Sequence, residues 1–227
     1  MRLTLPLLIS LFCLTGMSAQ DYLASPKFNQ FWRNLENIKM LDGEQPVDYK
    51  GTPYIYESEE AFITLENGQQ IKPLTLRYNV HDDVMEIKKD ERYYTIPKQK
   101  EFPLFTLGEH SFGLKVYQLI NKKQIGYFEA LVVDSGCSLY LKHKVFLQAA
   151  EEPKPFQDAK PAEFKNRAPE LYLSINDGVL QVVNSKNDLI DMLPDHKQEL
   201  SSFIKKHKTK FRKPESVKEV VEYYNSL

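Results

Sequence analysis

Apolar and polar residues alternate through the middle of the chain, from about residue 53 to residue 183. In residues 74–80, 139–147 and 171–175 every second side chain is apolar, His143 excepted. Successive side chains of a strand point to opposite faces, so this period of two predicts strands with one buried and one solvated face. In the first of these stretches Thr75, Arg77 and Asn79 would then face water.

Turn residues separate the alternating stretches. Asn67-Gly68 and Asp177-Gly178 are dipeptides that accept the backbone angles of tight hairpins. Polar breaks follow at residues 81–83, 88–91 and 121–123. A series of hairpins predicts an antiparallel β meander, either a curved sheet or a partly open barrel.

A longer break falls between Glu151 and Ala168. It contains Pro153, Pro155 and Pro161 together with charges throughout. Proline is rare inside paired strands, so we expect an extended surface crossover here rather than a linker between two domains.

Both ends of the chain show helical spacing. Ser25-Pro26 resembles a helix start, and apolar residues then recur every three to four positions: Phe28, Phe31, Trp32, Leu35 and Ile38. Near the other end, Ser185 and Asp188 resemble a capping box that opens a short helix reaching Leu193. Further helices are expected after Pro194-Asp195, with His196, Leu200, Phe203, Ile204 and His207 on one face, and after Pro214, with Val217, Val220, Val221 and Tyr224 on one face.

These patterns predict one α+β domain over residues 21–227. Its parts would be an N-terminal helix and lead-in over 21–50, an antiparallel β region over 51–184 and C-terminal helices over 185–227. A sheet followed by segregated helices is the α+β arrangement. A chain of this length with 42% apolar residues can bury a sizeable core.

Residues 1–20 have the order of features found in secretory signal peptides. Arg2 supplies a positive charge, an apolar run extends to Leu14, and small residues follow. Cleavage is expected after Ser18, Ala19 or Gln20, and an alternative is a lipoprotein signal in which Cys13 is acylated. The run is shorter than the roughly 20 residues of a membrane-spanning helix. We therefore expect an exported protein, periplasmic or extracellular, with no transmembrane segment after cleavage.

The net charge and the number of cysteines limit which partners and which covalent links the protein can have. The formal net charge is −1, so no global field favours nucleic acid, and no nucleic-acid partner is expected. Once the signal peptide is removed, Cys137 is the one remaining cysteine, and an internal disulfide is ruled out. Its thiol is then either a buried small apolar group or a reactive group. No pattern indicates a cofactor.

The strongest catalytic candidate is Asp134. Residues 131–136, Leu-Val-Val-Asp-Ser-Gly, match the signature loop of retropepsin-like aspartic proteases, in which two carboxylates share a proton and activate water. An alternating strand follows directly, where such a protease needs a different bracing element. Asp-Ser-Gly is also an ordinary turn between strands, and this interpretation is favoured.

Two further groups of residues carry weaker binding hypotheses. His81, Asp82 and Asp83 are residue types that bind zinc or other first-row metals, although nothing nearby in the sequence completes a ligand set, and a solvated turn is favoured. A basic run near the C-terminus could bind phosphates, lipid headgroups or lipopolysaccharide, or could simply complement the helix dipole: Lys205, Lys206, Lys208, Lys210, Arg212 and Lys213.

Several short motifs resemble an uncharacterised exported family of Bacteroidota. They are the G-x-P-Y strand at Gly51–Tyr54, the L-R-Y-N strand at Leu76–Asn79, the Y-Y-L strand, here Leu171-Tyr172-Leu173, and the closing Y-Y-N at Tyr223–Asn225. The resemblance implies a periplasmic or cell-envelope protein with no assigned activity, and it implies no catalytic residues.

Three function classes follow. The leading one is a non-catalytic envelope protein that binds an envelope partner or ligand through its sheet, because the 12% aromatic content can supply contact surface. The alternatives are a hydrolase that uses Asp134 and a lipid or lipopolysaccharide binder that uses the basic run, with peripheral membrane contact.

Overall fold

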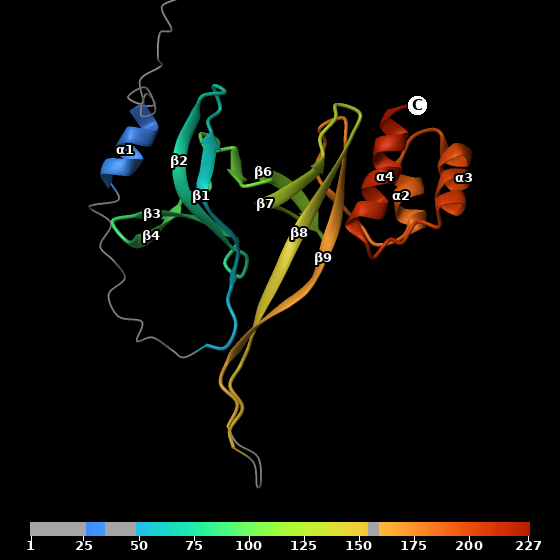
Figure 1. Ribbon diagram of the computed structural model, residues 1–227. Coiled ribbons are helices and arrows are strands. Elements are labelled where there is room, and N and C mark those ends of the chain that lie inside the picture. The colour runs from blue at the N-terminus through green and yellow to red at the C-terminus, as the bar shows by residue number, and fades with distance from the viewer. Residues whose placement is uncertain (1–25, 35–48, 154–158) are drawn as a thin grey trace, which may run out of the picture.

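The computed structural model describes residues 26–34, 49–153 and 159–227, which form a large sheet with helices at its two ends (Figure 1). The predicted signal peptide and the rest of residues 1–25 lie outside the described residues. The helices are α1 (Pro26–Asn34), α2 (Lys186–Met192), α3 (Lys197–His207) and α4 (Pro214–Asn225). The strands are β1 (Tyr54–Thr64), β2 (Gln70–Asn79), β3 (Val84–Lys89), β4 (Arg92–Ile96), β5 (Leu104–Leu107), β6 (His110–Leu119), β7 (Lys122–Val132), β8 (Cys137–Gln148), β9 (Glu163–Ile175) and β10 (Gln181–Val183).

The strands form one open antiparallel sheet in the order β10-β9-β8-β7-β6-β5-β1-β2-β3-β4. Hairpins connect β1 to β4 and β5 to β10 as expected, but the chain returns from β4 to pair β5 with the free edge of β1. The sheet is therefore two meanders joined at β1 and β5 rather than one. The coarse prediction, an antiparallel sheet with mainly C-terminal helices, is confirmed.

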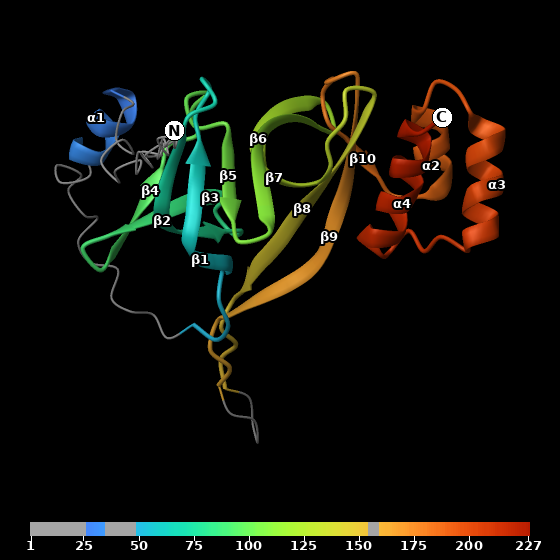
Figure 2. The ribbon, with the colours of Figure 1, turned by 45° about the horizontal axis from the view of Figure 1, so that its top comes forward.

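The sheet has three clusters of buried side chains. The first lies among β1–β7, the second lies between β8, β9 and helices α2–α4, and the third contains Phe128, Tyr140, Tyr172 and Leu180. The sheet curls so far that the Leu180 N–H donates to the Val116 carbonyl of β6 (Figure 2). Because helices cover one face and the curl encloses the other, β8 and β9 bury consecutive residues where a simple alternation was expected.

Two expectations about the β region are wrong. Asn79 does not face water: its amide donates to Asp82 (2.9 Å) and Glu86 (3.4 Å), so the polar side chain is buried with its partners. The segment after Glu151 is not a crossover, because Glu163 pairs with Gln148 and β9 runs back along β8. These two strands form a long twisted ribbon that extends beyond the rest of the sheet (Figure 1).

The helix signals in the sequence are local, and most appear as expected. Helix α1 begins at Pro26 and α4 at Pro214. Ser185 caps α2, because its hydroxyl accepts the Asp188 N–H (3.2 Å). Leu35 and Ile38 of the predicted N-terminal helix lie outside the described residues. Within the described ranges, no helix has the length and apolar character needed to cross a membrane.

Candidate functional site

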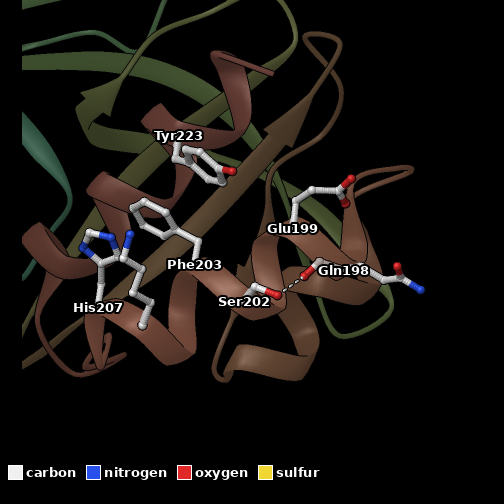
Figure 3. A pocket seen from close by; sticks show the side chains of 7 residues that line it. Gln198, Glu199, Ser202, Phe203, His207 and Tyr223 are labelled. Atoms are coloured by element: carbon white, nitrogen blue, oxygen red, sulfur yellow. Dashed lines mark hydrogen bonds between the residues drawn. The ribbon is translucent and has the colours of Figure 1, made fainter.

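A cleft of about 570 Å³ lies on the surface of the C-terminal helices (Figure 3). Helix α3 supplies most of its wall and α4 supplies one ring. The lining residues are Gln198, Glu199, Ser202, Phe203, Lys206, His207 and Tyr223. The Ser202 hydroxyl donates to the Gln198 carbonyl (2.9 Å), which holds that side of the wall to the helix backbone.

Three stacked rings form the apolar part of the cleft. The Phe203 ring lies between His207, at a centroid distance of 4.1 Å, and Tyr223, at 4.2 Å, and both pairs are nearly parallel. Phe203 and His207 are four residues apart on one helix, where side chains meet. Tyr223 is brought in by α4. Each outer ring therefore keeps one face that Phe203 does not cover.

The basic run follows directly from the cleft. All six cations, Lys205, Lys206, Lys208, Lys210, Arg212 and Lys213, are exposed. Among the described residues no salt bridge joins any of them to a carboxylate. Cations at the C-terminal end of α3 complement its dipole. Lys206 alone of the six lines the cleft, where it gives the rim one positive charge; the Glu199 carboxylate lines the cleft as well.

Asp134 lies in a hydrogen-bonded turn between β7 and β8. One carboxylate oxygen accepts the Gly136 N–H (2.8 Å), and the Asp134 carbonyl accepts the Ser138 hydroxyl (2.8 Å). Asn225 of the Y-Y-N motif donates to the Cys137 carbonyl (2.8 Å), which ties the turn to α4. Burial, with a smaller effect of the Asp134 charge, raises the pKa of the Cys137 thiol to about 12. The thiol is thus a buried, protonated group at neutral pH.

The three metal candidates point in different directions. His81 lies edge-on to the Phe164 ring at 5.4 Å. Asp82 is held by Asn79, and Asp83 turns inward, where it is part of a separate ion cluster. Within the described ranges no three histidine, cysteine or acidic side chains are arranged to hold a metal.

The ion cluster around Asp83 joins residues that are far apart in the sequence. Its carboxylate accepts the Lys142 ammonium (2.6 Å), the Lys98 ammonium (2.7 Å), the Tyr78 hydroxyl (2.6 Å) and the Tyr127 N–H (3.2 Å). The cluster sits against Gly126, where a Cβ atom would lie 2.7 Å from the Lys142 nitrogen. A side chain at this position would displace the ion pair.

Burial and the contact between Asp83 and Lys142 shift the pKa of both groups. Burial alone would raise the pKa of Asp83, but the charge and hydrogen bond of Lys142, with the Lys98 and Tyr78 hydrogen bonds, outweigh it and lower that pKa. Burial also lowers the pKa of Lys142, while Asp83 raises it. For Lys142 the effect of burial is the larger, so its pKa is lowered overall.

A second unforeseen cluster is centred on Glu129. Its two carboxylate oxygens accept ring N–H groups from His110 and His143, each at 2.5 Å. The Tyr56 ring stacks on His110 at 3.6 Å. Burial would raise the pKa of Glu129, but the hydrogen bonds and charges of the two histidines lower it. The sequence carried no signal for this group, because its members lie singly on three different strands.

The residues of the L-R-Y-N motif stabilise the hairpin between β2 and β3. The Arg77 guanidinium lies between the rings of Tyr54 and Tyr93, 3.7 Å and 3.5 Å from their centroids. It also pairs with Glu86 across the hairpin (2.7 Å). Tyr78 and Asn79 of the motif bind Asp83 and Asp82. These polar residues therefore organise the hairpin and its turn.

The α3–α4 cleft with its positive rim is thus the strongest candidate site among the described residues. No family model, no curated protein and no solved structure matches the chain significantly.

Proposed function

We propose that the chain is an exported binding module of the cell envelope, and that it binds an acidic saccharide in the cleft between α3 and α4. Export rests on the pattern of residues 1–20, and the envelope location rests on the resemblance to the Bacteroidota family. The ligand class rests on the chemistry of the cleft.

The proposal rests on the combination of stacked rings and an unpaired cation, Lys206, in one concavity. A volume of about 570 Å³ falls within the range of roughly 300–1,000 Å³ for small-ligand sites. The outer faces of His207 and Tyr223 offer apolar platforms for a sugar ring. Lys206 and the adjoining cations attract acidic groups, and Gln198, Glu199 and Ser202 can exchange hydrogen bonds with hydroxyls.

The surroundings of Asp134 and Cys137, the two residues that could act as catalysts, favour a binding role over hydrolysis. The Asp134 carboxylate is occupied as the acceptor of its own turn. The Cys137 thiol is buried and its pKa is raised, whereas a nucleophilic thiol needs a lowered pKa and access to substrate. The sheet face proposed from the sequence as a contact surface is filled by buried rings such as Tyr127, Tyr140 and Tyr172.

Three probe ligands separate the contribution of the sugar rings from that of the negative charge. A heparin tetrasaccharide carries rings and negative charge, tripolyphosphate carries charge alone, and maltotetraose carries neutral rings alone. Titration calorimetry is expected to rank the affinities in that order. If tripolyphosphate binds as tightly as the tetrasaccharide, the rings contribute nothing and the saccharide part of the proposal fails.

Variants assign the binding to the cleft. Lys206→Glu and Phe203→Ala are each expected to weaken tetrasaccharide binding at least tenfold. The first removes the cation of the cleft, and the second removes the ring on which His207 and Tyr223 stack. Lys100→Glu makes the same charge change at an exposed position after β4 and should leave the affinity within twofold. Equal losses in all three variants would mean that only overall charge matters, and the cleft would be rejected as the site.

A further inference from the structure

The hairpin between β6 and β7 ends in an exposed apolar tip, which we call the β6–β7 tip (residues 116–125). Seven large apolar side chains are exposed among the described residues, and four of them lie in this hairpin: Val116, Leu119, Ile120 and Ile125. Ile120 is 86% exposed. Single exposed apolar residues are common, but a cluster at one protrusion indicates a contact surface.

The backbone of Ile120 is strained as well. Ile120 has φ +50°, a conformation that is a marked outlier for a β-branched residue because its Cβ substituents crowd the backbone. The other hairpin turns place polar residues or glycine at positive φ: Gly68, Asp83, Asp90, Glu91, Gly108, Asn176 and Asp177. At this turn alone among those described, the chain keeps an isoleucine that costs stability in two ways. Such a residue points to a role outside the fold itself.

The backbone carbonyl at the turn has a hydrogen-bond partner within the hairpin, so the turn can leave water at little cost. The Gln118 side chain donates to the Ile120 carbonyl (2.8 Å), and the strand ladder continues to the pair Leu119–Lys122 beside the turn. A carbonyl that already has a partner loses little when it leaves water, whereas a free carbonyl would lose a hydrogen bond.

The surroundings of the tip indicate what it contacts. Lys122 and Lys123 are exposed, and among the described residues neither forms a salt bridge. Val116 and Ile125 are register partners and share one face of the hairpin, whereas Leu119, three residues on, points to the other face. Apolar groups on both faces suit a fluid medium that surrounds the tip. Lys122 and Lys123 lie on the two rungs next to the turn, where they can bind anionic headgroups.

We propose that the β6–β7 tip inserts into the surface of an anionic lipid bilayer. Ile120 and Leu119 enter the boundary of the acyl chains, and Lys122 and Lys123 beside them reach back to the phosphates. Val116 and Ile125 are farther from the turn and lie at the level of the headgroups. Insertion removes the exposed apolar area from water. The contact is peripheral and is separate from the cleft between α3 and α4.

Flotation with lipid vesicles tests this proposal. The protein is expected to float with phosphatidylcholine vesicles that contain phosphatidylglycerol, and much less with pure phosphatidylcholine. Ile120→Asn should lower the partition coefficient at least fivefold while raising the melting temperature, because asparagine tolerates positive φ. Lys122→Glu/Lys123→Glu should lower binding and remove its salt dependence. A gain in stability together with a loss of binding is a result that unfolding cannot produce.

Val133→Asn is the matched control. Val133, like Ile120, is an exposed β-branched residue, and it lies outside the hairpin with 73% of its surface exposed. It should float like the unmodified protein. The proposal is overturned if Ile120→Asn floats normally, or if no vesicle binds. It is also overturned if the tip variants change only self-association in sedimentation, which would identify the tip as a contact between two copies.

Discussion

Lysine has opposite surroundings in two regions of this molecule. Lys142 is largely buried, its side chain 12% exposed, among Asp83, the Tyr127 carbonyl and the Phe128 ring. Lys206 and its neighbours at the end of α3 are exposed and, within the described residues, have no carboxylate partner. A buried charge must find its partners within the fold, whereas an exposed charge keeps its hydration and stays ready for an outside anion. The difference separates lysines that hold the sheet from lysines that can bind.

The largest effect is expected from removing the buried counter-charge. Asp83→Asn keeps a residue that tolerates the φ of +56° at this position, but it leaves Lys142 buried without an anion. We expect a loss of about 3–5 kcal/mol in the free energy of unfolding, measured with urea. Adding Lys142→Met should restore most of the loss, because the pair is then replaced rather than broken. A loss below about 1 kcal/mol would show that the cluster is hydrated.

Glu129 should make stability depend on acidity. Its pKa is lowered in the folded state, so its contribution is complete above the ordinary value of 4.5 and is lost as the pH falls through the folded value. Glu129→Gln should lower the free energy of unfolding by about 1–3 kcal/mol at neutral pH. It should also make the further loss of stability at acidic pH smaller. Urea unfolding at a series of pH values measures both. Asp83, whose pKa is also lowered, contributes to the slope that remains.

Asn225 tests how the helices are joined to the sheet. Asn225→Ala removes the donor to the Cys137 carbonyl and leaves that carbonyl without this partner, at an expected cost of about 1–2 kcal/mol. Tyr224→Phe is the matched control, because the Tyr224 hydroxyl binds Asp195 at the exposed surface. Thermal unfolding should rank the asparagine variant clearly below the phenylalanine variant. The reverse order would place the important link at Asp195.

The smallest effect is expected at the exposed lysines. Lys205→Glu/Lys206→Glu should change the free energy of unfolding by less than about 1 kcal/mol, mainly through the dipole of α3. Urea unfolding of this variant and of Asp83→Asn under the same conditions compares the exposed lysines with the largely buried Lys142. If both variants destabilise equally, the basic run belongs to the structure and its role in binding is lost.

Much of the secondary structure was accessible from the sequence because its signals are local. The strand signal in residues 74–80, the Asn67-Gly68 turn and the cap at Ser185 each act within a few residues. The strand, the turn and the cap are all present, although Asn79 is buried and not solvated. The basic run was also predicted as an exposed surface. Asp134 was favoured as a turn, and its hydrogen bond to Gly136 has the geometry of one.

The tertiary structure decided which strands meet and therefore which charges meet. Asp83 was expected in a solvated turn, yet it pairs with Lys142, 59 residues away. His110 and His143 looked isolated until the sheet placed both on Glu129. The sequence by itself determined which residues alternate, turn and cap, because those preferences act over a few bonds. Register, curl and the return of β5 to β1 depend on many distant contacts at once, so only the folded sheet brings these side chains together.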